Sequence, residues 1–205
     1  VDRYTPASGT PLHPLLSAPG AGRPAALVLV SADRGLCGSY NVEIIREGLR
    51  FIREQQAQGV STQVLAVGQR GRDFMVRLGV NVVAELAKLS DRPSLLDTVP
   101  ISRVILQGWE RGEFGAVYLG YTEFVNVLTR RPRIRQLLPL TSFGQEIEGG
   151  KVDYIYEPEP LQVLSALLPR FVEVEVYQAI LEALASEHSA RMVSMRNATE
   201  NANDL

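Results

Sequence analysis

Between residues 25 and 140 the sequence alternates short apolar runs with longer amphipathic stretches, and this alternation constrains the fold more than any other feature. The run AALVLVS at 25–31 predicts a buried strand, and the amphipathic stretch at 39–58 predicts a helix. The buried face of that helix is expected to contain Val42, Ile45, Leu49 and Ile52. Further strands are expected at 63–67, 81–86, 116–124 and 130–140, and further helices at 70–78 and 93–112. The pattern predicts an α/β fold with a Rossmann-like, doubly wound, mostly parallel sheet.

Residues 161–205 contain no strand signal and one proline, Pro169, so they predict one long helix that Pro169 either begins or kinks. Beyond Leu184 the apolar stripe narrows, and its spacing of 4, 3, 4 and 3 residues is the repeat of a coiled-coil seam. The expected seam consists of His188, Met192, Met195, Thr199 and Ala202. No other segment has a matching heptad, so we expect this helix to be half of an antiparallel coiled coil whose other half is missing.

Three parts are therefore expected along the chain. Residues 1–24 are rich in Pro, Gly and Ser and predict a connector. Residues 25–158 predict the α/β domain, and residues 159–205 predict the C-terminal coiled-coil helix, which ends before its heptad pattern does.

Composition excludes several classes of function. The net charge of −2 supplies no field for gathering nucleic acid or anionic lipid, and no run approaches 18 apolar residues. We therefore expect no nucleic-acid partner and no direct insertion into a membrane. The single cysteine, Cys37, excludes an internal disulfide and is typical of a reduced compartment.

The turn SADRGLCGSYN at 31–41 lies between the first strand and the first helix, where many α/β proteins bind phosphate. It has no lysine after its glycines, as a P-loop requires, and it lacks the first glycine pair of a dinucleotide fingerprint. Gly35 and Gly38 are more simply explained by a tight crossing from strand to helix. A nucleotide or small-molecule enzyme that uses residues 33–41 stays open as the alternative function.

Other chemistry finds little support in the sequence. Cys37 beside a helix N-terminus could form a thiolate, but a thiol enzyme also needs a base, and the two histidines, His13 and His188, are poorly placed for that role. Two histidines and one cysteine do not make a ligand set. We expect no catalytic residues, no cofactor and no metal.

The segment DYIYEPEP at 153–160 has alternating aromatics and ends in two prolines, so it predicts extended backbone. Its tyrosines either anchor a protein contact or complete the sheet, and the residues alone leave both possibilities open.

Four stretches together resemble the γ subunit of F-type ATP synthase, of the bacterial type: SADRGLCGSYN at 31–41, RQLLPL at 135–140, DYIYEPEP at 153–160 and LASEHSARMVSMRNATENANDL at 184–205. The resemblance covers essentially the whole chain in the right order. It implies a central rotor shaft that couples rotation of the proton-driven c-ring to ATP synthesis on the α/β hexamer, with no catalysis of its own. It also implies that the N-terminal helix and the end of the C-terminal helix are missing.

The same resemblance implies partners and site residues. The partners are the α and β subunits, the ε subunit and the c-ring, and the location is the cytoplasmic face of the bacterial inner membrane, as a peripheral protein. Contact with β is implied for Gly35, Leu36, Cys37, Gly38 and Arg191. Contact with the c-ring and ε is implied for Tyr154, Tyr156 and Glu157. Two departures from the family pattern are Ser39-Tyr40 after the turn and Pro169 in the long helix.

Overall fold

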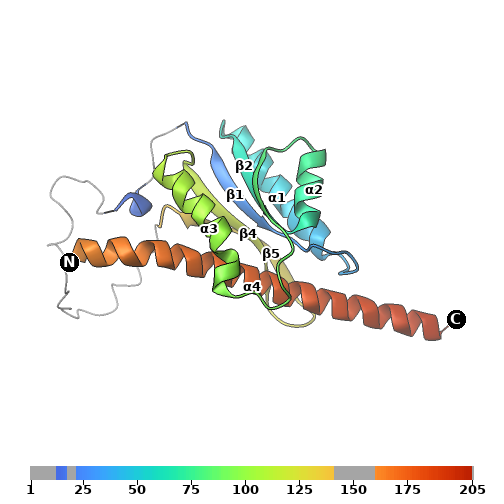
Figure 1. Ribbon diagram of the computed structural model, residues 1–205. Helices are drawn as coiled ribbons and strands as arrows, with labels where there is room; N and C mark the ends of the chain where they lie inside the picture. Colours follow the sequence, from blue (N-terminus) through green and yellow to red (C-terminus); the bar gives the residue numbers. More distant parts are fainter. Residues whose placement is uncertain (1–12, 18–21, 141–159, 205) are drawn as a thin grey trace.

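The computed structural model describes residues 13–17, 22–140 and 160–204 (Figure 1). A five-stranded sheet has the order β3-β2-β1-β4-β5. Its strands are β1 (Ala25–Val30), β2 (Thr62–Val67), β3 (Val82–Leu86), β4 (Ala116–Phe124) and β5 (Arg130–Leu138). All neighbours are parallel except β4 and β5, which are antiparallel. The α/β fold and the mostly parallel sheet are confirmed.

Helices cover both faces of the sheet. On one face lie α1 (Tyr40–Ala57) and α2 (Gln69–Arg77), which close a core cluster with β1 and β2. On the other face lie α3 (Leu95–Glu110) and α4 (Pro160–Asn203), which share a second and larger core cluster with β1 and β4. A short 3-10 helix, η1 (Pro14–Leu16), adds Leu15 to that second cluster. The strands are buried on both sides, which explains why β1 reads as an unbroken apolar run.

The expected buried face of α1 is partly wrong. The buried residues are Tyr40, Ile44, Ile45, Gly48 and Phe51. Val42, by contrast, is 56% exposed, because it faces the gap toward α2 and not the sheet. Gly48 lets α1 lie close to β1, because a Cβ there would come within 3.1 Å of the Leu29 side chain.

The long C-terminal helix is confirmed, and α4 runs for 44 residues past the sheet and beyond it (Figure 1). Pro169 lies inside α4 and does not begin it, since the helix starts at Pro160. The strand β5 lies at the edge of the sheet and contains Pro132, as expected. An edge strand tolerates proline, because the N–H group that proline lacks can be one that has no neighbouring strand to bond.

Candidate functional site

The inner face of α4 is part of the protein core. Its buried residues are Leu168, Val172, Val176, Ala179, Ile180 and Ala183. They recur at the spacing of a helix face and pack on β4, β5 and α3. Full burial of one large aliphatic side chain contributes about 1.5–3 kcal/mol, so this face fixes α4 to the domain.

Two serine hydroxyls attach α4 where it crosses the end of β4. Ser186 Oγ donates to the carbonyl of Thr122 at 3.0 Å, and Ser189 Oγ donates to the carbonyl of Val127 at 2.6 Å. Both hydroxyls are in buried residues, and such hydrogen bonds have a preferred geometry. They therefore fix the register of α4 on the sheet as well as its position.

The turn after β1 packs against the next stretch of α4. Cys37 is 2% exposed and forms a small cluster with Ala32, Tyr40 and Ala190. Asn41 supports the turn from the first turn of α1, because its side-chain oxygen accepts the amide of Ala32 at 2.9 Å. The cysteine that the sequence singled out is thus a packing residue beneath α4.

Charged and small residues complete this contact. Arg191 pairs with Glu187 at 2.6 Å and donates a hydrogen bond to the Gly35 carbonyl at 3.4 Å. Gly38 has a φ of +56°, and a Cβ there would come within 3.0 Å of Ser194 Oγ. Glycine at this position therefore permits both the left-handed backbone and the close approach of α4.

The pKa shifts of the titratable side chains in this turn disfavour a reactive thiolate. Burial raises the pKa of the Cys37 thiol, and Glu187 raises it further against the opposing effect of Arg191. Burial likewise raises the pKa of Tyr40 far above its usual value. His188 is exposed on the outer side of α4, and His13 caps η1 by accepting the amide of Leu15. The thiol is therefore held neutral, without either histidine as its base.

The usual ligand position of this fold is filled by α4. In doubly wound sheets ligands bind beyond the carboxyl ends of the strands, where the strand order reverses, and here that point lies between β1 and β4. Ser186 donates to Thr122 near the end of β4, and the side chains of Ser189 and Ala190 lie against the loops that follow β4 and β1. In the described residues no group of three His, Cys, Asp or Glu side chains could hold a metal ion.

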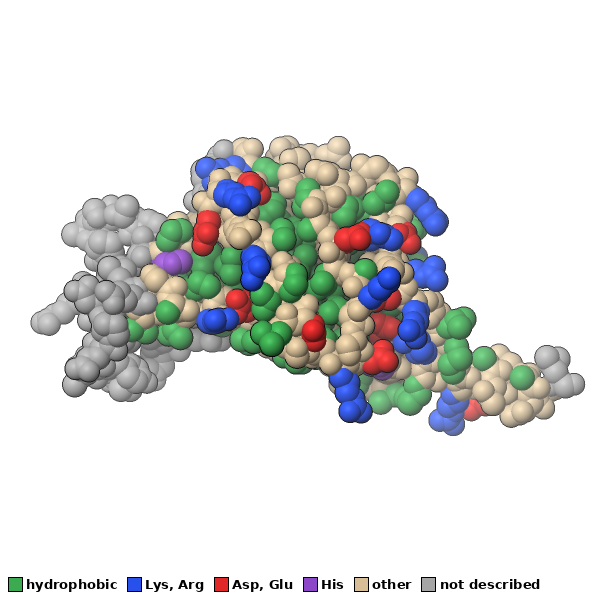
Figure 2. Space-filling model, viewed as in Figure 1, with side chains coloured by type: hydrophobic (Ala, Val, Ile, Leu, Met, Phe, Trp, Pro, Cys, Tyr) green, Lys and Arg blue, Asp and Glu red, His purple; other side chains and the backbone are tan. Residues whose placement is uncertain are grey.

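The outer face of α4 carries an exposed heptad seam. Its positions follow one another at 4 and 3 residues without a break: Leu167, Phe171, Val174, Gln178, Leu181, Ala185, His188, Met192, Met195, Thr199 and Ala202. Every one of them is exposed, and Met192 is 55% and Leu167 is 53% exposed. Figure 2 shows apolar side chains at the surface where α4 projects beyond the domain. All five seam residues expected from the sequence lie on this face.

Sequence reasoning found only the second half of the seam. Between 167 and 185 the helix carries two apolar stripes, one toward the sheet and one outward, and together they conceal the heptad. Continuing the 4,3 spacing backwards from His188 would have recovered Leu181 and Val174. The residues expected at the c-ring and ε, Tyr154, Tyr156 and Glu157, lie outside the described residues.

Fold and site together define a class of protein: an α/β domain that holds one long helix firmly by its inner face and presents a coiled-coil seam on the outer face. The family model described as ATP synthase matches residues 4–205. The chain is 51% identical over 180 residues to the ATP synthase gamma chain of Roseiflexus castenholzii, covering 88% of this chain and 62% of the relative. It is 46% identical over 198 residues to the ATP synthase gamma chain of Herpetosiphon aurantiacus, covering 94% of this chain and 67% of the relative. The chain belongs to the ATP synthase gamma chain family.

Solved structures agree with this assignment. The central stalk and c-ring structure of the Tetrahymena thermophila mitochondrial ATP synthase contains a chain that matches with a TM-score of 0.70 and 26% identity, over 89% of this chain and 79% of that one. A rotor chain of the Euglena gracilis mitochondrial enzyme shares the fold, with a TM-score of 0.64 at 15% identity, over 97% of this chain and 78% of that one. The chain spans about 62% of the length of the Roseiflexus relative.

Proposed function

We propose that this chain forms part of the central rotor shaft of a bacterial F1Fo ATP synthase and couples proton-driven rotation of the c-ring to ATP synthesis on the α/β hexamer. The observation that carries the proposal is the exposed heptad seam on α4, whose opposite face is fixed to the α/β domain. An antiparallel helix on that seam completes a coiled coil, and its side chains interlock as knobs in holes. The chain itself supplies no catalytic residue.

The mechanism follows from the two faces of α4. Torque that enters through the α/β domain reaches the shaft through the buried contacts from Leu168 to Ala183 and the hydrogen bonds of Ser186 and Ser189. Because close-packed cores resist deformation, this junction transmits rotation as a rigid body. The coiled coil then carries the rotation into the ring of α and β subunits.

Contact with β is assigned to Gly35, Leu36, Cys37, Gly38 and Arg191, which lie together at one end of the domain. Leu36 is the side chain available for a partner, because it is 76% exposed and has a φ of +62°. An exposed leucine held in the left-handed region is uncommon, and the cost of about 1 kcal/mol or more is consistent with a side chain displayed for contact. Cys37 and Arg191 attach the turn to α4, because Cys37 packs against Ala190 and Arg191 donates to the Gly35 carbonyl.

The proposal extends to the foot of the rotor and to its location. Contact with the c-ring and ε is assigned to Tyr154, Tyr156 and Glu157, on the family resemblance of the DYIYEPEP segment. Among the described residues no helix is long and apolar enough to cross a membrane. A rotor subunit of the bacterial enzyme would be held at the cytoplasmic face of the inner membrane through the c-ring, as a peripheral protein.

The test is reconstitution of the full-length subunit with α and β subunits and observation of ATP-driven rotation of a bead fixed to the α/β domain. Met192→Glu with Met195→Glu places charges in the seam and is expected to abolish assembly or rotation. Asn197→Glu with Asn201→Glu is the matched control, because both residues are exposed on α4 away from the seam. Normal rotation of the Met192→Glu, Met195→Glu variant would overturn the proposal.

The alternative, a nucleotide enzyme that uses residues 33–41, is disfavoured by the position of α4 over that turn. Calorimetry of the 205-residue chain with ATP distinguishes the two. The rotor proposal expects no micromolar binding, whereas micromolar affinity that Gly38→Val removes would favour the alternative.

A further inference from the structure

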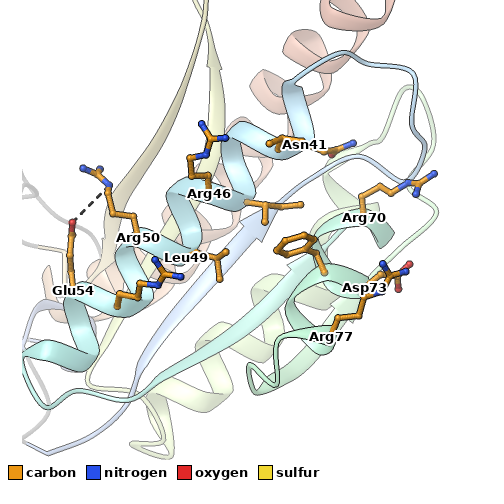
Figure 3. Close-up of a pocket in the computed structure, with 12 residues that line it drawn as sticks. Asn41, Arg46, Leu49, Arg50, Glu54, Arg70, Asp73 and Arg77 are labelled. Carbon is orange, nitrogen blue, oxygen red and sulfur yellow. Dashed lines mark ion pairs between the residues drawn. The ribbon is translucent and has the colours of Figure 1, made fainter.

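A second surface lies on the opposite side of the sheet from α4, between α1 and α2. It is a groove with a volume of about 770 Å³. Its apolar floor comes from Val42, Ile45, Leu49 and Phe74. In Figure 3 Leu49 lies between the two helices, with Arg46 and Arg50 along α1 on one side and Arg70 and Arg77 along α2 on the other.

The apolar part of the groove is exposed in a way that the fold does not require. Val42 is 56% exposed and Phe74 is 41% exposed, although each lies beside the buried side chains that attach its helix to the sheet. Packing of α1 and α2 on the sheet uses Ile44, Ile45, Phe51 and Met75, with Leu49 partly buried against them, so the exposed part of the floor is Val42 and Phe74. The floor of the groove therefore offers apolar surface that a partner could remove from water.

The walls of the groove are basic. Guanidinium groups outnumber carboxylates five to two: the arginines are Arg46, Arg50, Arg53, Arg70 and Arg77, and the acids are Glu54 and Asp73. Both acids already have partners, since Glu54 pairs with Arg50 and Asp73 pairs with Arg72. Among the described residues the other four arginines of the groove have no ion pair with a carboxylate.

We propose that this groove docks an acidic amphipathic helix of a partner protein. The lining residues of α1 run from Asn41 to Glu54, which is almost four helical turns or about 20 Å, and those of α2 run from Arg70 to Arg77, which is about 10 Å. An apolar floor between a longer basic wall on α1 and a shorter one on α2 matches a helix with apolar residues at i, i+3, i+4 and i+7 and with Asp or Glu on both flanks. The arginines are spread along the walls and do not converge on one point, as recognition of a single phosphate would need.

This surface is separate from the rotor site. The groove belongs to the α1 and α2 face, whereas the junction of α4 belongs to the α3 and α4 face. The docking proposal therefore stands or falls independently of the rotor proposal, and each has its own readout.

The first test measures binding of labelled 15-residue peptides to the 205-residue chain by fluorescence anisotropy. One peptide carries leucines at the spacing above with glutamates elsewhere, and its matched partner has lysines in place of the glutamates. We expect the acidic peptide to bind at least about tenfold more tightly than the basic one. Equal affinity of the two peptides, or stronger binding of a nucleic-acid oligomer at the same groove, would overturn the proposal.

Variants locate the binding. Arg46→Glu with Arg77→Glu reverses one charge on each wall and is expected to lower the affinity for the acidic peptide by about tenfold or more. Arg103→Glu is the control, because Arg103 is exposed on α3 on the other face of the sheet. Circular dichroism verifies that each variant is folded. An equal effect of the control and the double variant contradicts the assignment of the groove.

A second measurement identifies the natural occupant. A photo-cross-linking amino acid replaces Phe74 in the full-length subunit within its native complex, and a second sample carries it at Leu96, which is 79% exposed on α3. Mapping the Phe74 adduct to an acidic helical segment of another protein supports the proposal. An adduct within this chain, or no adduct above the Leu96 sample, overturns it.

Discussion

The two halves of α4 have the same backbone structure and opposite surroundings. From Leu168 to Ala190 one side of the helix is buried on the sheet while the other is exposed, so this half is held by the fold. From Met192 to Asn203 no residue is buried, and apart from the approach of Ser194 to Gly38 the described contacts of this half are hydrogen bonds and an ion pair within the helix itself. Since most helical stability in proteins comes from packing, the first half is anchored and the second depends on a partner.

The difference explains how one helix can serve two purposes. The anchored half, Leu168–Ala190, joins the helix to the domain, and the free half, Met192–Asn203, leaves its surface open to a partner. The outer seam crosses both halves without a change in its 4,3 spacing, so a partner helix could lie along the whole length. Three pairs of matched substitutions and one measurement of pH dependence test this comparison.

The largest expected effect is in the core of the anchored half. Ile180→Ala is expected to lower the free energy of unfolding by about 2–5 kcal/mol, because Ile180 is fully buried and its loss leaves a cavity. Met195→Ala in the free half is expected to change it by less than about 0.5 kcal/mol. Urea denaturation measures both, and similar values for the two variants would refute the distinction between the halves.

Overpacking beneath α4 comes next. Ala190 is buried against Ala32, Cys37 and Tyr40, so Ala190→Leu is expected to destabilise the protein by about 1–3 kcal/mol. Ala198→Leu, at an exposed position of the free half, is expected to be close to neutral. Thermal denaturation compares them, and a neutral Ala190→Leu would show that the turn and α4 are not tightly packed.

A smaller effect is expected from the hydroxyls. Ser186→Ala removes the hydrogen bond to the buried end of β4 and is expected to cost about 1 kcal/mol. Thr199→Ala also removes a hydroxyl hydrogen bond, to the carbonyl of Met195, but on an exposed surface where water replaces it. Chemical denaturation that finds equal losses for the two would contradict the role of Ser186 in fixing α4.

The smallest effect is a dependence on alkaline pH. The pKa values of Cys37 and Tyr40 are raised by burial in the folded protein, so both groups keep their protons when the unfolded chain loses them. The folded state then binds more protons, and stability that is present below about pH 9 declines as the pH rises further. The free energy of unfolding is expected to fall by less than about 1 kcal/mol between pH 8 and 9.5. Cys37→Ala with Tyr40→Phe should flatten this decline, and an unchanged slope would place its origin elsewhere.

Much of the fold could be predicted from local patterns. The unbroken apolar run of β1 indicated a strand buried on both faces, and the strand–helix alternation indicated the parallel sheet. The face of α1 could not be predicted fully, because Val42 is as apolar as a core residue although it faces the groove. The origin of the seam at Leu167 was concealed because the sheet-facing stripe of α4 adds apolar residues between the heptad positions.

The candidate site likewise has one part that could be predicted from the sequence and one part that could not. The heptad from His188 to Ala202 was visible because no second stripe accompanies it in the free half. The packing of Cys37 under Ala190 was not visible, because it joins residues more than 150 positions apart. The spacing of apolar residues in the sequence predicts which face of a helix is periodic. A contact between a turn and a distant helix depends on the tertiary fold, which the spacing does not contain.

The central claim, that the outer seam of α4 pairs with another helix, is tested most directly by cysteine labelling along α4 in a Cys37→Ala background. Single cysteines at Leu181, Met192 and Met195 report the outer seam, and one at Val176 reports the inner face. In the 205-residue chain the outer positions should label rapidly and Val176 slowly. In the full-length subunit assembled in its complex, the outer positions should become protected by about tenfold or more, while Val176 stays slow. Outer positions that label equally fast in both samples would contradict the account.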